Sequence, residues 1–270
     1  MIRVGIGGWT FAPWRGSFYP VGLKQADELA YAASKLTTIE INGTFYRTQS
    51  AASFAKWRDE TPDDFVFAVK GHRNIVNSRK LAETRESIDW FFGSGILELG
   101  PKLGPILWQM APFKQFDGDD LAAFLALLPR EIGGRTLTHA FEPRHESFME
   151  QRFVEICRDA GIAIVKADSA KYPMIGDLTG DIVYARLQNA AAGEPNGYAD
   201  TALDRWATQS RDWAEGRADA DAPLFADSGD PRPRPVFVFM INGAKEKAPA
   251  AALGLINRLA AGSIVRENLR

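Results

Sequence analysis

Short runs of apolar residues, rich in Val, Ile and Phe, recur along the chain and end in polar residues or glycine. Runs of about four to eight residues of this kind, bounded by turn residues, are typical of buried β-strands. We predict eight strands, at residues 4–9, 37–46, 65–70, 105–110, 138–142, 162–168, 181–187 and 236–242.

Between most of these runs the apolar residues recur at helical spacing, as at Leu29, Ala33 and Leu36. We predict helices at residues 23–36, 50–61, 81–92, 117–128, 147–160, 203–214 and 248–259. After the sixth strand the helical pattern fails, so we expect a weak or missing helix there. Residues 219–235 are polar and proline-rich, and we predict a long, mobile surface segment before the eighth strand.

Short strands that are apolar on both faces and alternate with helices are typical of a parallel sheet. Eight strands in a chain of 270 residues favour one (β/α)8 TIM-type barrel domain over residues 1–270. The glycines of the first strand, Gly5, Gly7 and Gly8, do not form the dinucleotide-binding spacing, which argues against a nucleotide-binding fold of that kind.

Composition narrows the class of protein without naming it. A net charge of −2 argues against a broad nucleic-acid-binding surface. The single cysteine, Cys157, excludes an intramolecular disulfide, and its helical context favours a packed thiol. No leader-like segment opens the chain and no apolar run approaches the length of a membrane span, so we expect a cytoplasmic protein without a membrane partner.

The second strand carries a carboxylate where a buried strand would not need one. With period-two alternation, Ile39 and Ile41 face one side, and Glu40 and Asn42 face the other. In a barrel one of these sides faces the interior. The same reasoning predicts further inward polar residues near the ends of the other strands: Lys70, His72, Gln109, Glu142, Arg144, Lys166, Asp168, Arg186, Gln188 and Asn242.

Active sites of such barrels lie at the C-terminal ends of the strands, where we expect these side chains to meet. Four cations would face three carboxylates, which suits a small anionic ligand bearing phosphate or carboxylate. The predicted catalytic residues are Glu40, Lys70, Glu142, His145 and Asp168. The predicted binding residues are Trp9, Asn42, Tyr46, Gln109, Arg144, Lys166, Arg186, Gln188 and Asn242.

Each of these residues also has a structural interpretation. Glu40 and Glu142 could pair with arginines to hold strands in register, Lys70 could be a counter-ion, nucleophile or base, and His145 could cap a helix. The aromatic residues could simply pack. Glu142, Asp168 and a nearby histidine or Glu40 are also possible ligands of a divalent metal, but no paired histidines occur at ligand spacing, so we predict no cofactor.

Taken together, several motifs resemble those of the YecE-like proteins, the domain of unknown function numbered seventy-two. They are Gly7-Gly8-Trp9, Trp14-Arg15-Gly16, Phe18-Tyr19-Pro20, Glu40 to Tyr46, Phe65 to Lys70, Leu103-Gly104-Pro105 and Glu142 to Phe148. The resemblance implies a TIM-type barrel and supplies no settled activity. The chain departs from the family pattern at Phe148, at Gln188-Asn189 and at Ile241-Asn242.

From the sequence we therefore predict an enzyme that acts on a small anionic ligand by general acid/base chemistry, with Arg144, Arg186 and Lys70 holding the anion. Two alternatives remain open: a nucleic-acid-processing phosphodiester hydrolase, and a barrel that binds a ligand without catalysis. The oligomeric state is not predicted.

Overall fold

A single parallel sheet, curved into a barrel, forms the centre of the computed structural model, which describes residues 1–219, 221–227 and 231–267. Its strand order is β8-β7-β4-β3-β2-β1-β11-β10-β9. The strands are β1 Ile2–Gly7, β2 Thr38–Ile41, β3 Val66–Lys70, β4 Leu103–Gln109, β7 His139–Glu142, β8 Ala163–Ile164, β9 Lys166–Asp168, β10 Val183–Leu187 and β11 Val236–Met240.

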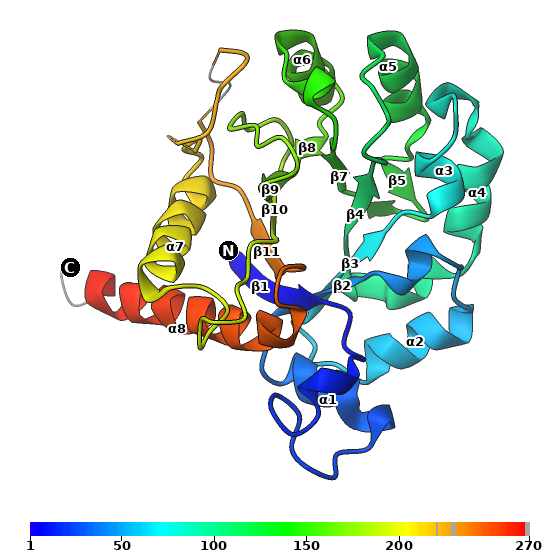
Figure 1. Ribbon diagram of the computed structural model, residues 1–270. Helices are drawn as coiled ribbons and strands as arrows, with labels where there is room; N and C mark the ends of the chain where they lie inside the picture. The colour runs from blue at the N-terminus through cyan, green and yellow to red at the C-terminus, as the bar shows by residue number, and fades with distance from the viewer. Residues whose placement is uncertain (220, 228–230, 268–270) are drawn as a thin grey trace.

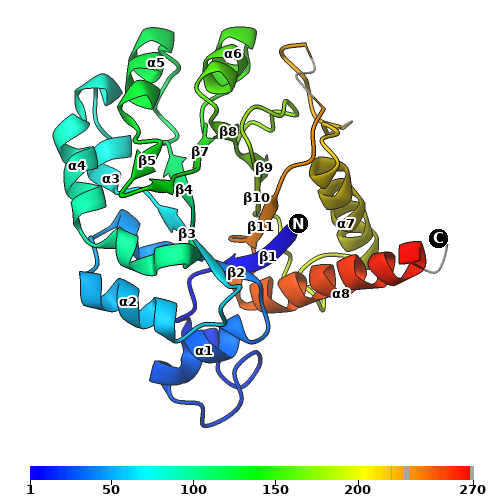
Figure 2. The same cartoon turned by 180° about the vertical axis from the view of Figure 1, so that it is seen from behind.

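The first and last strands of this order, β8 and β9, are two halves of one segment separated only by Val165. The first half pairs with β7 and the second with β10, while the backbone N–H of Val165 donates to the carbonyl of Phe141 at 2.9 Å. The same stretch of chain therefore closes the sheet, and Figure 2 shows its two halves following one another along the chain. The predicted α/β barrel is confirmed.

Helices surround the barrel, as Figure 1 shows. They are α1 Glu28–Ala33, α2 Ala51–Asp59, α3 Arg73–Val76, α4 Arg85–Gly93, α5 Gly118–Leu127, α6 Gln151–Asp159, α7 Asp200–Ala214 and α8 Ala248–Glu267. Ser50 caps α2, because its hydroxyl accepts the Ser53 N–H at 3.2 Å. Across the described part of the chain, no helix is long and apolar enough to cross a membrane.

Two helix predictions were incomplete, and one small hairpin was not predicted. The first helix is shorter than residues 23–36, because residues 25–27 form a 3-10 turn instead. The predicted helix at 81–92 is likewise divided, and the Thr84 hydroxyl donates to the Leu81 carbonyl at 2.6 Å where the two parts meet. A small hairpin of β5 Glu131–Ile132 and β6 Arg135–Thr136 was missed, although Gly133 and Gly134, both with positive φ, are its sequence signal.

Between β9 and β10 no helix forms in the described residues, as predicted. The irregular segment at 169–182 and the one between α7 and β11 cover the barrel there instead. The carboxylate of Asp177 accepts the N–H groups of Phe225 and Ala226 at 2.9 and 3.1 Å. Asp219, Ala222 and Arg234 are buried. The expectation of an entirely surface-lying segment at 219–235 was therefore wrong, while residues 220 and 228–230 of that segment lie outside the described residues.

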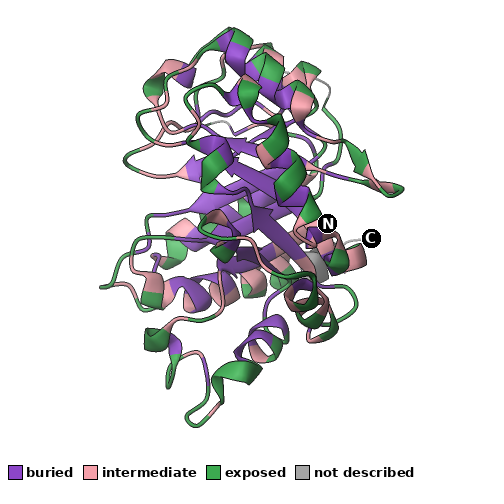
Figure 3. Cartoon of the chain, turned by 90° about the vertical axis from the view of Figure 1, so that its right-hand side faces the viewer, coloured by how far each residue is buried: buried purple, intermediate pink, exposed green. Residues whose placement is uncertain are grey.

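The interior of the barrel is filled by an apolar layer, and the strands are buried on both faces (Figure 3). This layer consists mainly of Ala68, Leu107, Ala140, Val165, Tyr184, Phe237, Phe239 and Ile241. The outward side chains of the same strands, such as Ile39 and Val69, belong to the larger core beneath the helices. The polar side chains toward the C-terminal ends of β2, β3, β4, β7 and β10 follow this inner layer, which places them at the mouth of the barrel.

Candidate functional site

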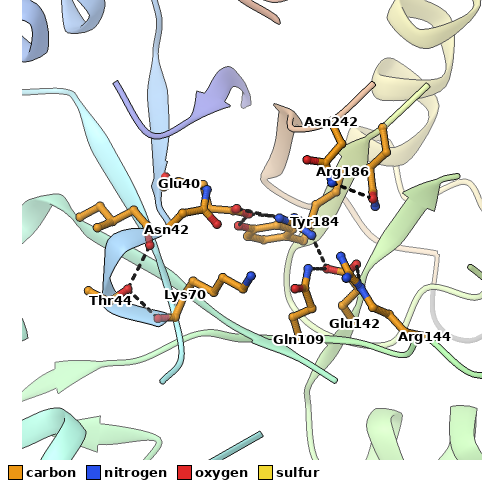
Figure 4. A network of polar contacts seen from close by, with 12 residues as sticks. Glu40, Asn42, Thr44, Lys70, Gln109, Glu142, Arg144, Tyr184, Arg186 and Asn242 are labelled. Atoms are coloured by element: carbon orange, nitrogen blue, oxygen red, sulfur yellow. Dashed lines mark hydrogen bonds and ion pairs between the residues drawn. The ribbon is translucent and has the colours of Figure 1, made fainter. Parts of the chain in front are cut away.

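Five strands contribute polar side chains to one buried network at the mouth (Figure 4). Glu40 comes from β2, Lys70 from β3, Gln109 from β4, Glu142 from β7 and Arg186 from β10. All five are at most 8% exposed. Strand parity predicted that these residues face the interior, and the structure brings them together there.

Arg186 is the centre of this network, because it joins both carboxylates. Its Nε and Nη2 donate to the two oxygens of Glu40 at 3.0 and 2.9 Å, and its Nη1 donates to Glu142 at 2.7 Å. Burial alone would lower the pKa of Arg186, but Glu142 and Glu40 raise it above its usual value. The guanidinium is therefore a permanent charge that connects β10 to β2 and β7.

Tyr184 is a member of the network that the sequence reasoning missed. Its hydroxyl donates to Glu40 at 2.6 Å, and the side chain is fully buried. Burial first, and then the charge of Glu40, raise the pKa of Tyr184 well above its usual value, so the phenol stays protonated as a donor. The available signal was its position two residues before Arg186 on the same strand, which gives both side chains the same orientation.

Glu142 is saturated with donors. Besides Arg186 it accepts a hydrogen bond from Gln109 Nε2 at 2.8 Å and one from Arg144 Nε at 2.9 Å. Burial raises its pKa, but Arg186 and Arg144 outweigh that effect and hold the pKa of Glu142 below its usual value. A carboxylate with three cationic or amide donors is a poor proton acceptor, because each donor favours the charged form that is already present.

Lys70 differs from its neighbours because its amine has no such partner. Figure 4 shows its side chain extended toward the network without a dashed line at Nζ. Nζ lies 4.1 Å from the centre of the Phe45 ring, and it makes no hydrogen bond or ion pair to any residue that the structure describes. Burial first, and then the charge of Arg186, lower the pKa of Lys70 to about 8.

Two further side chains leave donors unused at the mouth. The Arg144 guanidinium stacks on Tyr172 with 4.3 Å between its central carbon and the ring centre, and Nη1 approaches the Tyr172 hydroxyl at 3.5 Å. Gln188 is 8% exposed, and its Oε1 accepts from Asn242 Nδ2 at 3.4 Å. Its Nε2 has no partner among the described residues.

The charges of the network do not cancel. Lys70, Arg144 and Arg186 are three cations, while Glu40 and Glu142 are two carboxylates, which leaves one positive charge when Lys70 is protonated. Two cations are fixed in ion pairs and the third is unpaired. The arrangement can therefore accept one anionic group at Lys70 without losing an existing ion pair.

Lys166 and Asp168 were predicted to point into the mouth, and the structure contradicts this. Ala163 and Val165 face the barrel interior, so Lys166 and Asp168 take the opposite orientation. The amine of Lys166 donates to the carbonyl of Ile175 at 2.7 Å and to that of Asp177. Burial lowers its pKa to about 7.

Asp168 lies at the rim, outside the network. Its two oxygens accept hydrogen bonds from Asn189 Nδ2 at 2.7 Å and from the Tyr198 hydroxyl at 2.9 Å. Asn242 is exposed, because Ile241 takes the inward position at the end of β11. Among the described residues, the recorded side-chain hydrogen bond of Asn242 is the one to Gln188.

The two histidines near the mouth cap short helices. His72 Nδ1 accepts the Asn74 N–H at 3.2 Å at the start of α3, and His145 Nδ1 accepts the Ser147 N–H at 3.1 Å. These contacts occupy one ring nitrogen of each histidine. The capping interpretation of His145 thus has direct structural support, and its proposed catalytic role stays an untested prediction.

Three predicted binding residues lie beside the network rather than in it. The Trp9 ring packs edge-on against Trp57 of α2, with 4.9 Å between ring centres. Tyr46 is 65% exposed. The amide of Asn42 donates to the backbone carbonyl of Glu40 at 3.5 Å. Among the described residues, Trp9 and Tyr46 have no recorded side-chain contact with the network, and Asn42 reaches it only at the backbone of Glu40.

The acidic residues weighed as metal ligands are separated. In the described part of the chain, no three His, Cys, Asp or Glu side chains are grouped so that they could hold a metal ion. Cys157 is completely buried beneath the helices, and burial raises the pKa of its thiol.

Comparison with known proteins gives a family without an activity. A family model described as "Protein of unknown function DUF72" matches residues 3–268. UPF0759 protein YunF of Bacillus subtilis is 26% identical over 160 residues, which are 57% of this chain and 55% of YunF. UPF0759 protein YecE of Escherichia coli K12 is 26% identical over 149 residues, or 55% of this chain and 50% of YecE.

The chain thus spans about half the length of the curated relatives it matches. Solved structures cover more of it. A DUF72 family protein from Thermotoga maritima superposes with a TM-score of 0.72 at 22% identity, over 96% of this chain and 99% of that one. One from Enterococcus faecalis gives 0.69 at 17% identity, over 96% of each chain. These structures agree with the fold, and the resemblance to the YecE-like proteins is confirmed.

Proposed function

The chain belongs to the DUF72 family of proteins of unknown function, and we propose that it is an enzyme acting on a small anionic compound at the barrel mouth. The observation that carries the proposal is the unpaired amine of Lys70 beside carboxylates that are fully paired. In this architecture, active sites are found at the C-terminal ends of the strands, where this network lies.

The anionic character of the ligand follows from the unused donors. Lys70 carries the charge that no carboxylate neutralises, Arg144 has guanidinium hydrogens beyond its bond to Glu142, and Gln188 has a free amide. Phosphate and carboxylate oxygens accept hydrogen bonds from all three kinds of donor. A neutral ligand would leave the surplus charge buried without a partner, which is costly.

Lys70, rather than Glu40 or Glu142, supplies the reactive group in this proposal. Both carboxylates already accept two or more strong hydrogen bonds, so neither is ready to take a proton. A lysine whose pKa is about 8 exists partly as the neutral amine near neutral pH. This proposal changes the roles that the sequence-based hypothesis gave to these residues. Glu40 and Glu142 now position the arginines, and Lys70 is the group that reacts.

The first test measures ligand-dependent thermal stabilisation with a panel of small phosphates and carboxylates. A ligand that binds only the folded state raises the melting temperature in proportion to its affinity and concentration. We expect stabilisation of the wild type by at least one class of anion, and its loss in Lys70→Met. Lys245→Met is the matched control, because Lys245 also lies over aromatic rings, Phe11 and Trp14, with a lowered pKa.

The second part of the test asks whether binding leads to chemistry. Compounds that stabilise the wild type are incubated with it, and their NMR spectra are followed for conversion. Conversion by the wild type and not by Lys70→Arg is the expected result. A compound that binds at the mouth and is recovered unchanged points instead to a barrel that binds without catalysis, and the absence of any anion-dependent stabilisation contradicts the anionic site itself.

A further inference from the structure

The chemistry of the ligand can be narrowed further if the proposed anionic site is accepted as the starting point. We propose that Lys70 is a nucleophile that forms an imine with an aldehyde or ketone carrying a phosphate or carboxylate group. The amine of Lys70 would attack the carbonyl carbon, while Arg144 and Gln188 hold the anionic group.

The contacts of the other buried lysines set Lys70 apart. Lys102 Nζ donates to the carbonyls of Arg58 and Thr61 at 2.5 and 2.6 Å, and Lys166 Nζ donates to the carbonyls of Ile175 and Asp177. A carbonyl accepts from the ammonium form and occupies its hydrogens, so such lysines hold chain segments together. Lys70, also buried at 8% exposure, lies over the face of the Phe45 ring, and its amine makes no hydrogen bond to the residues that the structure describes.

The immediate surroundings favour the neutral amine that such an attack requires. The guanidinium groups of Arg186 and Arg144 repel an additional positive charge, while Glu40 and Glu142 act in the opposite direction. The arginines are themselves tied to those carboxylates, which reduces the attraction left for the lysine. With a pKa of about 8, roughly one amine in ten is neutral at pH 7, against fewer than about one in a thousand for an ordinary lysine. A desolvated lysine beside other cations is a known way to make this side chain nucleophilic.

The unused donors define the rest of the ligand. Gln188 lies two residues beyond Arg186, directly after the end of β10, and its backbone N–H still pairs with the Asp168 carbonyl at 3.0 Å, which favours the same side as Arg186. Its Oε1 is occupied by Asn242, which leaves Nε2, a buried donor, for a ligand oxygen. The Arg144 guanidinium lies over the Tyr172 ring, with 4.3 Å between its central carbon and the ring centre, and this contact restricts its position before any ligand arrives. The Lys70 side chain extends toward the same network (Figure 4), so the proposal requires that a ligand bound by these donors present its carbonyl to the Lys70 amine.

The proposed step balances without an oxidant or reductant. The lone pair of the neutral amine forms a bond to the carbonyl carbon, and the carbonyl π electrons move to oxygen. A proton passes from nitrogen to that oxygen to give a carbinolamine. The C–O bond then breaks, and with one proton from solvent the oxygen leaves as water. The product is a protonated imine at Lys70, which withdraws electrons from the neighbouring carbon of the ligand.

Reductive trapping tests this directly. The full chain is incubated at pH 7 with sodium cyanoborohydride and one of four aldehydes: glyoxylate, acetaldehyde, glycolaldehyde phosphate or glycolaldehyde. The first and third carry a carboxylate and a phosphate, and the second and fourth are their uncharged counterparts. Adducts are counted by intact mass and located by peptide mapping. We expect one fast adduct at Lys70 with a charged aldehyde, formed at least tenfold faster than with its uncharged counterpart and slowed by inorganic phosphate.

Two variants make the result specific. Lys70→Arg keeps the positive charge but cannot form the imine, so the fast adduct should disappear. Lys245→Arg removes another lysine that lies over aromatic rings, and the adduct at Lys70 should persist. Adducts spread over exposed lysines at equal rates, or no adduct at all, would overturn the imine. If phosphate still stabilises the wild type against heat in that case, the anionic site survives and only the nucleophile is wrong. If phosphate and the other anions also fail to stabilise it, the proposed function falls as well.

Discussion

Two buried lysines on strands of the same barrel, Lys70 on β3 and Lys166 on β9, differ in orientation and in hydrogen-bond partners. Burial lowers the pKa of both, to about 8 and about 7 respectively. Lys166 faces outward and donates to two carbonyls of the irregular segment that replaces a helix after β9. Lys70 faces the mouth and lies over the ring of Phe45.

The difference shows that a lowered pKa does not by itself identify a reactive lysine. By that measure Lys166 would be the better candidate. The hydrogen-bond partners decide instead, because an amine whose hydrogens are bound to buried carbonyls cannot leave them without exposing unpaired acceptors. The same contrast separates Arg186, which is fully paired, from the free donors of Arg144 and Gln188.

The largest effect on folding is expected for the most completely paired group. Arg186→Met would leave Glu40 and Glu142 buried and without their main counter-ion. Breaking a buried ion pair from one side costs about 3 to 5 kcal/mol. We expect a loss of that size in the free energy of unfolding, measured by urea denaturation. A loss below about 1 kcal/mol would mean that the network is not structurally coupled as described.

Lys166→Met is expected to have the next largest effect. The methionine fills similar space but leaves the carbonyls of Ile175 and Asp177 unpaired in the interior. A buried acceptor left without its donor costs about 1 to 3 kcal/mol. Lys35→Met, at an exposed position, serves as the control and should change the free energy of unfolding by no more than about 0.5 kcal/mol. Equal stability of the two variants would refute the structural role of Lys166.

The ionisation of Lys70 should make a smaller contribution, which appears in the pH dependence of the free energy of unfolding. Its folded-state pKa of about 8 lies below the ordinary value of 10.5, so between these values the unfolded chain binds more protons. The free energy of unfolding therefore rises with pH in that window, by up to about 1.4 kcal/mol per pH unit for this one group. Lys70→Met lacks this group, so its stability profile should miss the increment, and the wild-type profile should rise relative to it across this window. Parallel profiles of the two proteins from pH 8 to 10 would contradict the lowered pKa.

At pH 7 the same substitution should change stability least. The protonated amine is withdrawn from water without a hydrogen-bonding partner, so removing it removes a cost. We expect Lys70→Met to be between unchanged and about 1 kcal/mol more stable than the wild type. A loss above about 2 kcal/mol would show that Lys70 is structural, as Lys166 is.

The part of the site that could be predicted came from strands whose two faces differ. In β2, Ile39 and Ile41 alternate with Glu40, and in β7 Phe141 precedes Glu142, so parity could be assigned. Residues 162–165 are all apolar. In β11, Val236–Met240, the residues on both faces are apolar as well. A strand buried on both sides carries no alternation from which to assign an orientation. The predictions for Lys166, Asp168 and Asn242 failed for that reason.

The sequence could not show which carboxylate pairs with which cation, and the reason is a different one. Glu40 and Arg186 are 146 residues apart, and Glu142 and Arg186 are 44 apart. Which carboxylate meets which cation depends on closure of the barrel and on the register of its strands. The sequence could therefore place several charges at the mouth, but it could not show that both glutamates would be saturated and Lys70 left over.

The most direct test of this account compares the two lysines in a single sample of native protein. The rate of acetylation by trace acetic anhydride is measured at each by peptide mass spectrometry from pH 6 to 10, with and without inorganic phosphate. We predict that Lys70 is labelled with an apparent pKa near 8 and is protected by phosphate, while Lys166 is labelled only after unfolding. Labelling of native Lys166 at the rate of Lys70, or labelling of Lys70 that phosphate does not slow, would contradict the central claim that hydrogen-bond partners separate the reactive lysine from the structural one.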